Sequence, residues 1–237
     1  AQAQLFFENT YSNFSEARKI NVTTDGGYII SGTSDYLGNN DMAMMKLDIT
    51  GNVEWSHAYG NDLDNDFAEA VTQTLDGGFL LVGGSGNNYN FYVKTDSLGN
   101  EQWHKYYNLN NVRYGTGIVA LSDTTYIISG GGSLDQSHAG LTKLDKDGNV
   151  LWTFNIPTGS YTCCTYYPQF YNVIELANGQ ILAMGSRFYS SSGRAYLLLI
   201  NPDGTIVWEK QYASGMIRFY NGVQLSDGNI VLVGRGN

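Results

Sequence analysis

Two adjacent cysteines, Cys163 and Cys164, are the strongest candidates for covalent or redox chemistry in this 237-residue sequence. Because neighbours in the chain cannot join distant segments, the pair could be two free thiols, one strained disulfide, or two small buried residues. The histidines do not complete a catalytic set, since His57 and His104 each follow a repeated tryptophan within two positions and are explained by their place in a strand.

Recognised catalytic motifs are absent from the sequence. It contains no H-E-x-x-H zinc motif, no G-x-S-x-G turn for a nucleophile and no phosphate-binding Walker sequence. Two acidic stretches, 62–66 and 145–149, do not fit a calcium-binding EF-hand loop, whose twelfth position here holds Gln73 or Ile156. We therefore expect turns at both stretches, no metal site, no catalytic residues and no enzymatic activity.

Aromatic residues and arginines gather in the stretches that separate the predicted strands. Tyr and Arg are typical of surfaces that bind proteins, peptides or sugars, although tyrosines can also simply cover loop backbone. The stretch 158–167 is longer than its counterparts and holds both cysteines. The candidate binding residues of the chain are Tyr161, Cys163, Cys164, Tyr166, Tyr167, Phe188, Tyr189, Arg113, Tyr114 and Arg218.

Composition limits the classes of partner. Apolar residues make up 42% of the chain, which suffices for a buried core, whereas charged residues make up only 15%. A net charge of −9 repels a phosphate backbone, so we expect no nucleic-acid partner. No apolar stretch is long enough to span a bilayer. Abundant Gly and Tyr with scarce Pro favour short strands joined by tight turns.

A repeat of about 48 residues organises the chain. Each of the four tryptophans, Trp55, Trp103, Trp152 and Trp208, stands four residues after a glycine. A second marker, D-G-G-[YF] with a further Gly four residues later, occupies 25–32 and 76–83, with weaker copies at 123–130, 178–185 and 227–234. This period and a strand-rich composition predict four-stranded propeller blades rather than a helical solenoid.

These markers predict a single all-β domain, 1–237, that forms a β-propeller of about five four-stranded blades. The repeats span about 16–59, 67–107, 115–156 and 168–212, with a partial repeat at 218–237. The segment 5–11 resembles a fourth strand without its own blade, and it is the candidate strand that closes the ring. The alternative is that the chain is part of a longer protein.

Loop lengths distinguish the two faces of such a propeller. Turns between the first and second strands, and between the third and fourth, are short and uniform, and both kinds lie on one face. The loops between the second and third strands, and between blades, are longer, differ in every repeat and lie on the opposite face, here called the loop face. Because variable loops on a rigid scaffold usually carry function, we expect binding at the loop face.

The two markers together resemble the secreted propeller repeats of Bacteroidota proteins, from residue 16 to residue 234. That resemblance implies export through the type 9 secretion system and a place at the cell surface, in the periplasm or outside the cell. The repeat, the aromatic loop face and the absent catalytic set favour a protein partner, such as an outer-membrane or secretion complex, or a glycan. The opening Ala1-Gln2-Ala3 fits the end of a signal peptide or an arbitrary boundary.

The D-x-x-G-x-x-x-W segment is similar to the tryptophan-docking motif of pyrroloquinoline-quinone (PQQ) propellers, which implies that the four tryptophans pack between neighbouring blades. PQQ dehydrogenases also stack a vicinal disulfide on their cofactor, and Cys163–Cys164 resembles that pair. PQQ and calcium are thus the alternative cofactors. However, those enzymes resemble rings of more blades, and no calcium ligands or acidic base can be assigned in this sequence.

The sequence favours a non-catalytic, extracytoplasmic binding or scaffold module without a cofactor, which engages a protein partner or a glycan through its loop face. One alternative is a PQQ-type quinoprotein or another propeller enzyme. The other is an architectural segment of a longer surface adhesin.

Overall fold

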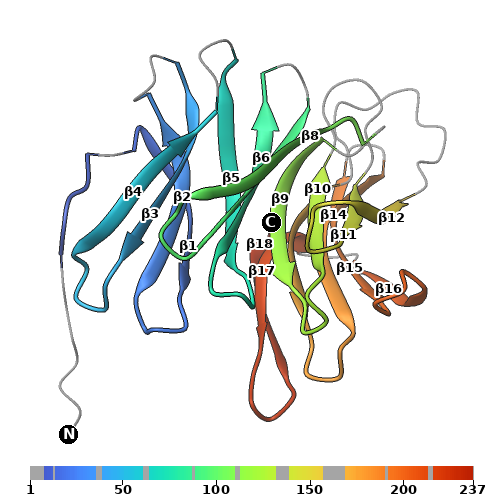
Figure 1. Cartoon of the computed structure of the whole chain (residues 1–237). Helices are drawn as coiled ribbons and strands as arrows, with labels where there is room; N and C mark the ends of the chain where they lie inside the picture. Colours follow the sequence, from blue (N-terminus) through green and yellow to red (C-terminus); the bar gives the residue numbers. More distant parts are fainter. Residues whose placement is uncertain are drawn as a thin grey trace, which may run out of the picture. The chain divides into compact units, whose positions relative to one another are not determined.

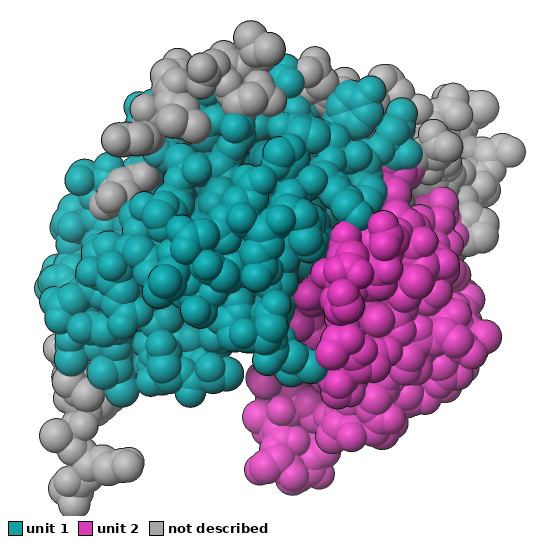
Figure 2. Space-filling model, in the orientation of Figure 1, with its two compact units in different colours: residues 1–108 teal, residues 109–237 magenta. Residues whose placement is uncertain are grey.

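The computed structural model of the chain describes residues 8–12, 14–35, 39–60, 64–86, 89–109, 113–131, 139–156, 169–189, 192–212 and 216–236. These residues form 18 strands, all paired antiparallel, and no helix (Figure 1). The described part of the chain accordingly has no helix long and apolar enough to cross a membrane. The chain divides into two compact units, 1–108 and 109–237 (Figure 2).

Unit 1 contains two four-stranded sheets with their strands in sequence order. A core cluster that includes Met44, Phe79 and Leu81 joins the two sheets. The third strand of each sheet is buried along its whole length. Blade 1 consists of β1 (Glu16–Val22), β2 (Tyr28–Ser34), β3 (Asp41–Leu47) and β4 (Val53–Tyr59), and blade 2 of β5 (Asp66–Gln73), β6 (Phe79–Ser85), β7 (Asn90–Thr95) and β8 (Glu101–Tyr107).

In unit 2 the pairing of Gly131 with Gln169 joins two four-stranded arrays into one eight-stranded sheet, and a separate two-stranded pair follows. One core cluster, with Ile127, Phe170 and Leu198, joins blades 3 and 4, and another, with Leu182 and Phe219, joins blades 4 and 5. Blade 3 consists of β9 (Arg113–Ala120), β10 (Tyr126–Gly131), β11 (Gly140–Leu144) and β12 (Val150–Asn155). Blade 4 consists of β13 (Gln169–Glu175), β14 (Ile181–Tyr189), β15 (Ser192–Ile200) and β16 (Ile206–Tyr212), and blade 5 of β17 (Met216–Gln224) and β18 (Ile230–Gly236).

The repeated antiparallel sheets confirm the predicted all-β propeller class. The inner strands β5, β9 and β17 begin at residues 66, 113 and 216. The pairing of each of the five inner strands, β1, β5, β9, β13 and β17, with its neighbour contains a register shift.

A one-residue bulge in the inner strand explains the last glycine of the D-G-G marker. In β5 the ladder passes from Ala68 to Ala70 and leaves Glu69 outside the pairing. The bulge brings the Phe67 carbonyl oxygen to 1.9 Å from the place that a Cβ on Gly83 would take. Only glycine therefore fits opposite the bulge. The same approach of a backbone carbonyl, at 2.0 Å, recurs at Gly32 and Gly185.

A buried lysine on the third strand forms an ion pair with the Asp of the D-G-G turn. The Lys94 ammonium group, on a residue only 2% exposed, lies 2.9 Å from the Asp76 carboxylate and 2.8 Å from the Thr95 carbonyl oxygen. Gly78 leaves room for it, since a Cβ there would stand 2.7 Å from the lysine nitrogen. A buried charge needs such partners. The pair recurs as Lys46–Asp25 at 2.8 Å and Lys143–Asp123 at 3.1 Å.

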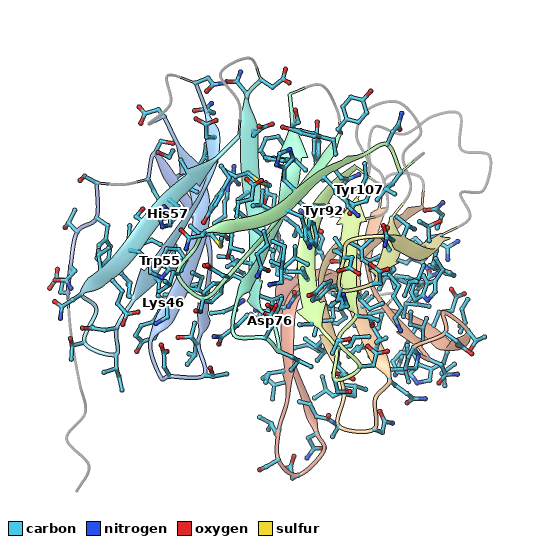
Figure 3. All side chains as sticks on the ribbon, viewed as in Figure 1. Lys46, Trp55, His57, Asp76, Tyr92 and Tyr107 are labelled. Atoms are coloured by element: carbon cyan, nitrogen blue, oxygen red, sulfur yellow. The ribbon has the colours of Figure 1, made fainter. Side chains whose placement is uncertain are left out.

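Two of the four repeat tryptophans pack on the following blade. The Trp55 ring on β4 lies 5.6 Å from the Phe79 ring and against Gly99, where a Cβ would stand 2.9 Å from the indole (Figure 3). Trp152 packs on Gly204 in the same way and donates a hydrogen bond from Nε1 to the Pro202 carbonyl at 3.3 Å. In both cases the glycine belongs to the turn before the fourth strand of the next blade.

For the other two tryptophans the docking role stays a prediction. Trp103 ends blade 2, and the blade that follows it belongs to unit 2. Trp208 ends blade 4 and is 39% exposed. Its following blade contains only β17 and β18 in the described residues, so the turn that receives Trp55 and Trp152 elsewhere has no counterpart there.

The N-terminal segment is described from residue 8, and its residues 8–12 form no strand. The side chains of Asn9 and Tyr11 donate hydrogen bonds to the Gly51 carbonyl, at 3.0 and 2.6 Å, which anchors them on the β3–β4 turn of unit 1. Residues 5–7 lie outside the described part of the chain. Closure of the ring by segment 5–11 therefore stays a prediction, as does the single-domain organisation.

Candidate binding cleft

Half of the ten predicted binding residues lie outside the described part of the chain. The binding role of the segment 157–168 stays a prediction for Tyr161, Cys163, Cys164, Tyr166 and Tyr167. Three others occupy loop-face ends of strands β9 and β14, where their backbone is described but their side chains are not: Arg113, Phe188 and Tyr189.

The described residues of unit 2 form a cleft of about 510 Å³ between the outer strands of blades 3 and 4. This volume lies within the usual range for sites that bind small molecules. The end of β12 lines one side, β14 and β15 contribute one residue each, and β16 contributes the rest. The lining residues are Phe154, Asn155, Ile156, Arg187, Tyr196, Ile206, Trp208 and Glu209.

Three polar side chains meet in this cleft. The Tyr196 hydroxyl donates a hydrogen bond to the Glu209 carboxylate at 2.6 Å, and a guanidinium nitrogen of Arg187 lies 3.8 Å from the same oxygen. The Arg187 guanidinium carbon is also 5.8 Å from the centroid of the Tyr196 ring, within the range of a cation–π interaction. The Glu209 side chain is 53% exposed and that of Arg187 only 18%, so the carboxylate is the group that solvent reaches most readily.

Strand pairing explains why these groups meet. Leu198 on β15 lies opposite Glu209 on β16, and Tyr196 is two residues from Leu198, so all three side chains point to the same side of the sheet. Tyr196 and Leu198 belong to the core cluster between blades 3 and 4. Glu209 thus stands where the apolar interface between two blades gives way to solvent. Trp208, which precedes Glu209 on the edge strand β16, also lines the cleft.

Arg218 and Tyr114, the two predicted binding residues with described side chains, do not line the cleft. The Arg218 guanidinium carbon lies 5.9 and 5.8 Å from the ring centroids of Tyr171 and Tyr220, and it donates a long hydrogen bond of 3.4 Å to the Tyr171 hydroxyl. Tyr114 adopts a left-handed backbone conformation, with φ of 55°, beside the bulge of β9. Both residues lie near loop-face ends of inner strands.

Sequence reasoning missed the cleft because its polar residues fall inside predicted strands. Tyr196 and Glu209 are 13 positions apart and become neighbours only through the pairing of β15 with β16. One signal was available. Glu209 is the only acidic residue that directly follows a repeat tryptophan, where the other repeats have Ser56, His104 and Thr153.

Among the described residues, no group of three or more His, Cys, Asp and Glu side chains gathers as metal ligands would. The stretch 145–149 forms the turn that its sequence predicts, in which the Asp145 carboxylate accepts hydrogen bonds from the backbone of Asp147 and Asn149 at 2.9 and 2.7 Å. No ligand set for calcium or PQQ can be assigned from these side chains, and the absence of a cofactor stays a prediction.

Comparison with known proteins supports the fold. No protein-family model matches the sequence, and no curated protein matches it. The WD40 domain of Neurospora crassa Pan2 superposes on 92% of this chain with a TM-score of 0.55 and 10% identity, over 60% of its own chain. A neuraminidase-like protein of A/little yellow-shouldered bat gives a TM-score of 0.54 at 12% identity, over 94% of this chain and 67% of its own.

A third structure, the quinohemoprotein alcohol dehydrogenase of Comamonas testosteroni, gives a TM-score of 0.50 at 13% identity, over 93% of this chain and 40% of its own. This chain therefore spans 60% of the Pan2 chain and less than half of the dehydrogenase chain. At such low identity the likenesses show a propeller-type repeat fold. Because these propellers include both WD40 domains and enzymes, the fold does not decide between binding and catalysis.

Proposed function

We propose that the protein is a non-catalytic binding module, and that the cleft between blades 3 and 4 takes a short segment of a glycan. The observation that carries this proposal is the meeting of the Glu209 carboxylate, the Tyr196 hydroxyl and the Arg187 guanidinium in a cleft with an apolar wall. Convergent polar groups in an apolar depression are the usual pattern of a site for a small polar ligand.

The chemistry of these groups suits a sugar. The Glu209 carboxylate can accept hydrogen bonds from two adjacent hydroxyl groups, and the Arg187 guanidinium can donate to hydroxyl or ring oxygens. Phe154 and Ile156 supply apolar surface for the C–H face of a sugar ring. A folded protein partner would need roughly 800 Å² of surface on each side, which a cleft of this size does not provide by itself.

An extracytoplasmic location belongs to the same proposal. Its support is the resemblance of the repeats to those of exported Bacteroidota proteins, together with the low charge and the Tyr-rich composition. Type 9 secretion and attachment to an outer-membrane complex rest on that resemblance alone. Fractionation of the native cells, followed by detection of the protein in each fraction, tests the location.

The test of the glycan proposal uses the intact 237-residue chain. A panel of immobilised oligosaccharides identifies a ligand, and calorimetry then compares the wild type with the variants Glu209→Ala and Lys210→Ala. Loss of the carboxylate should weaken binding about tenfold or more, which corresponds to roughly 1.4 kcal/mol. Lys210 is the matched control, since it is exposed, adjacent on β16 and on the opposite side of the strand.

Equal affinity of the wild type and Glu209→Ala for the oligosaccharide would show that the cleft is not the binding site. If no oligosaccharide in a panel of neutral and acidic sugars binds, the ligand is not a glycan. Steady release of cleaved sugar during the titration would show a hydrolase instead of a binding module.

A further inference from the structure

The arginines of the chain gather at the loop-face ends of the unit 2 strands. Five of the six arginines belong to unit 2, although the chain as a whole has a net charge of −9. Each of the five stands within three residues of the strand end that lies away from the short turns. They are Arg113 on β9, Arg187 on β14, Arg194 on β15, Arg218 on β17 and Arg235 on β18.

Two of these arginines directly oppose each other. Arg218 on β17 pairs with Arg235 on β18, and like charges in such cross-strand positions repel. Within the described residues neither arginine forms an ion pair with an Asp or Glu. The segments 157–168 and 213–215, which precede β13 and β17, also contain no acidic residue. The pair therefore lacks a counterion in the part of the chain that is described.

Two tyrosines flank the Arg218 side chain. Tyr171 and Tyr220 are the residues that the ladders of β13 and β17 skip, and a bulge redirects the side chain that it carries. Their rings meet edge to face with centroids 5.2 Å apart, and Tyr220 is 41% exposed. The Nε atom of Arg218 is buried and has no hydrogen-bond partner among the described residues.

We propose that Arg218 and Arg235, together with Tyr171 and Tyr220, bind the carboxylate of an acidic sugar. The inference rests on the proposed glycan function and adds the charge of the ligand to it. A carboxylate between two guanidinium groups removes their repulsion and accepts charge-assisted hydrogen bonds from both. The exposed Tyr220 ring offers a face on which the sugar ring stacks. An uncharged sugar cannot neutralise either guanidinium group.

The experiment compares a galacturonate trisaccharide with the uncharged galactose trisaccharide by calorimetry on the full chain. The wild type should bind the acidic sugar at least tenfold more tightly, and added salt should reduce this preference. In Arg218→Gln/Arg235→Gln the affinity for the acidic sugar should fall to that for the neutral one. Arg235→Gln alone, at an exposed position, should lose part of the preference without any effect on the fold.

Lys105→Gln, which removes one half-buried cation from β8 in unit 1, is the control and should keep the full preference. Equal affinity of the wild type for the two sugars would overturn this inference and leave the neutral glycan site intact. If the affinity for the acidic sugar falls in the Arg218 variant but not in Glu209→Ala, the cleft is not the glycan site. That result would still support binding by the arginine pair. If a polyglutamate peptide of the same charge binds as tightly as the acidic sugar, the assignment to sugars would be overturned.

Discussion

The two units repeat one strand pattern but differ in their charges. Unit 1 contains 14 Asp and Glu against 5 Lys and Arg, whereas unit 2 contains eight of each. At the loop-face ends of its strands unit 1 has Asp41 and Asp66, both fully buried, and unit 2 has its arginines. Because the sheets are alike, the scaffold does not require this difference. The comparison favours unit 2 as the unit that binds and unit 1 as the unit that supports it.

The units also differ in which of their blades contain the buried Lys–Asp ion pair. Both blades of unit 1 and blade 3 of unit 2 have the Lys–Asp pair. In blade 4, Leu199 takes the place of the lysine and Asn178 that of the aspartate. The Asn178 amide there donates to the Gln180 side-chain oxygen at 2.9 Å. The joint replacement fits a lysine whose buried charge needs the aspartate as its partner.

The largest expected effect tests whether the bulge is shared by the two units. Gly83→Ala should destabilise unit 1 by about 3 kcal/mol, because the new methyl group meets a backbone carbonyl that cannot move aside. Gly185→Ala should do the same in unit 2. Gly77→Ala is the control, with open space around it but φ of 83°, and should cost about 1 kcal/mol. Urea denaturation measures all three, and a mild effect at Gly83 would contradict the bulge account.

A somewhat smaller effect should separate the tryptophans. Trp152→Ala should cost about 2–3 kcal/mol, because it removes the packing on Gly204 and the hydrogen bond to Pro202. Trp208→Ala should cost less than about 1 kcal/mol, since that side chain is 39% exposed. Thermal unfolding of the two variants measures the difference. Equal losses would show that Trp208 is docked as well.

The third prediction concerns pH and unit 1 alone. Burial raises the pKa of Asp66 to about 6, the Ser85 hydroxyl lowers it, and the carboxylates of Asp64 and Asp41 raise it further. Because the folded state holds this proton more tightly than the unfolded chain, stability falls as pH rises from about 4 to 6 and then levels off. Asp66→Asn should thus stabilise unit 1 by roughly 2 kcal/mol at pH 8 and by little at pH 4.

Hydrogen exchange in β5–β8, followed across this pH range, measures the effect within unit 1. A variant less stable than the wild type at pH 8 would mean that the ionised Asp66 carboxylate is well paired.

The smallest expected effect compares the ion pair between blades. Asp76→Asn leaves Lys94 buried with only oxygen acceptors from Thr95 and Gln102, and should cost about 1–2 kcal/mol. The reverse change in blade 4, Asn178→Asp, meets no lysine and should change stability by less than about 0.5 kcal/mol. Denaturant titration of both variants measures the contrast. Similar losses would show that the turn, and not the lysine, requires the aspartate.

Sequence alone predicted the fold well because its markers report local geometry. The Asp-Gly turns and the Trp spacing indicate where strands end. The Lys94–Asp76 pair was visible only as scattered residues, since register brings them together across 18 positions. The cleft and the Arg218–Arg235 pair depend likewise on strand pairing. Of the loop residues chosen from composition, Arg218 is the one that the structure places in a described cluster.

Hydrogen–deuterium exchange of the full chain, with and without the galacturonate trisaccharide, tests most directly whether unit 2 is the binding unit. We expect slower exchange at saturating sugar in β14–β18, where the cleft and the arginine pair lie, and no change in β1–β8. Slower exchange confined to β1–β8 would contradict the account.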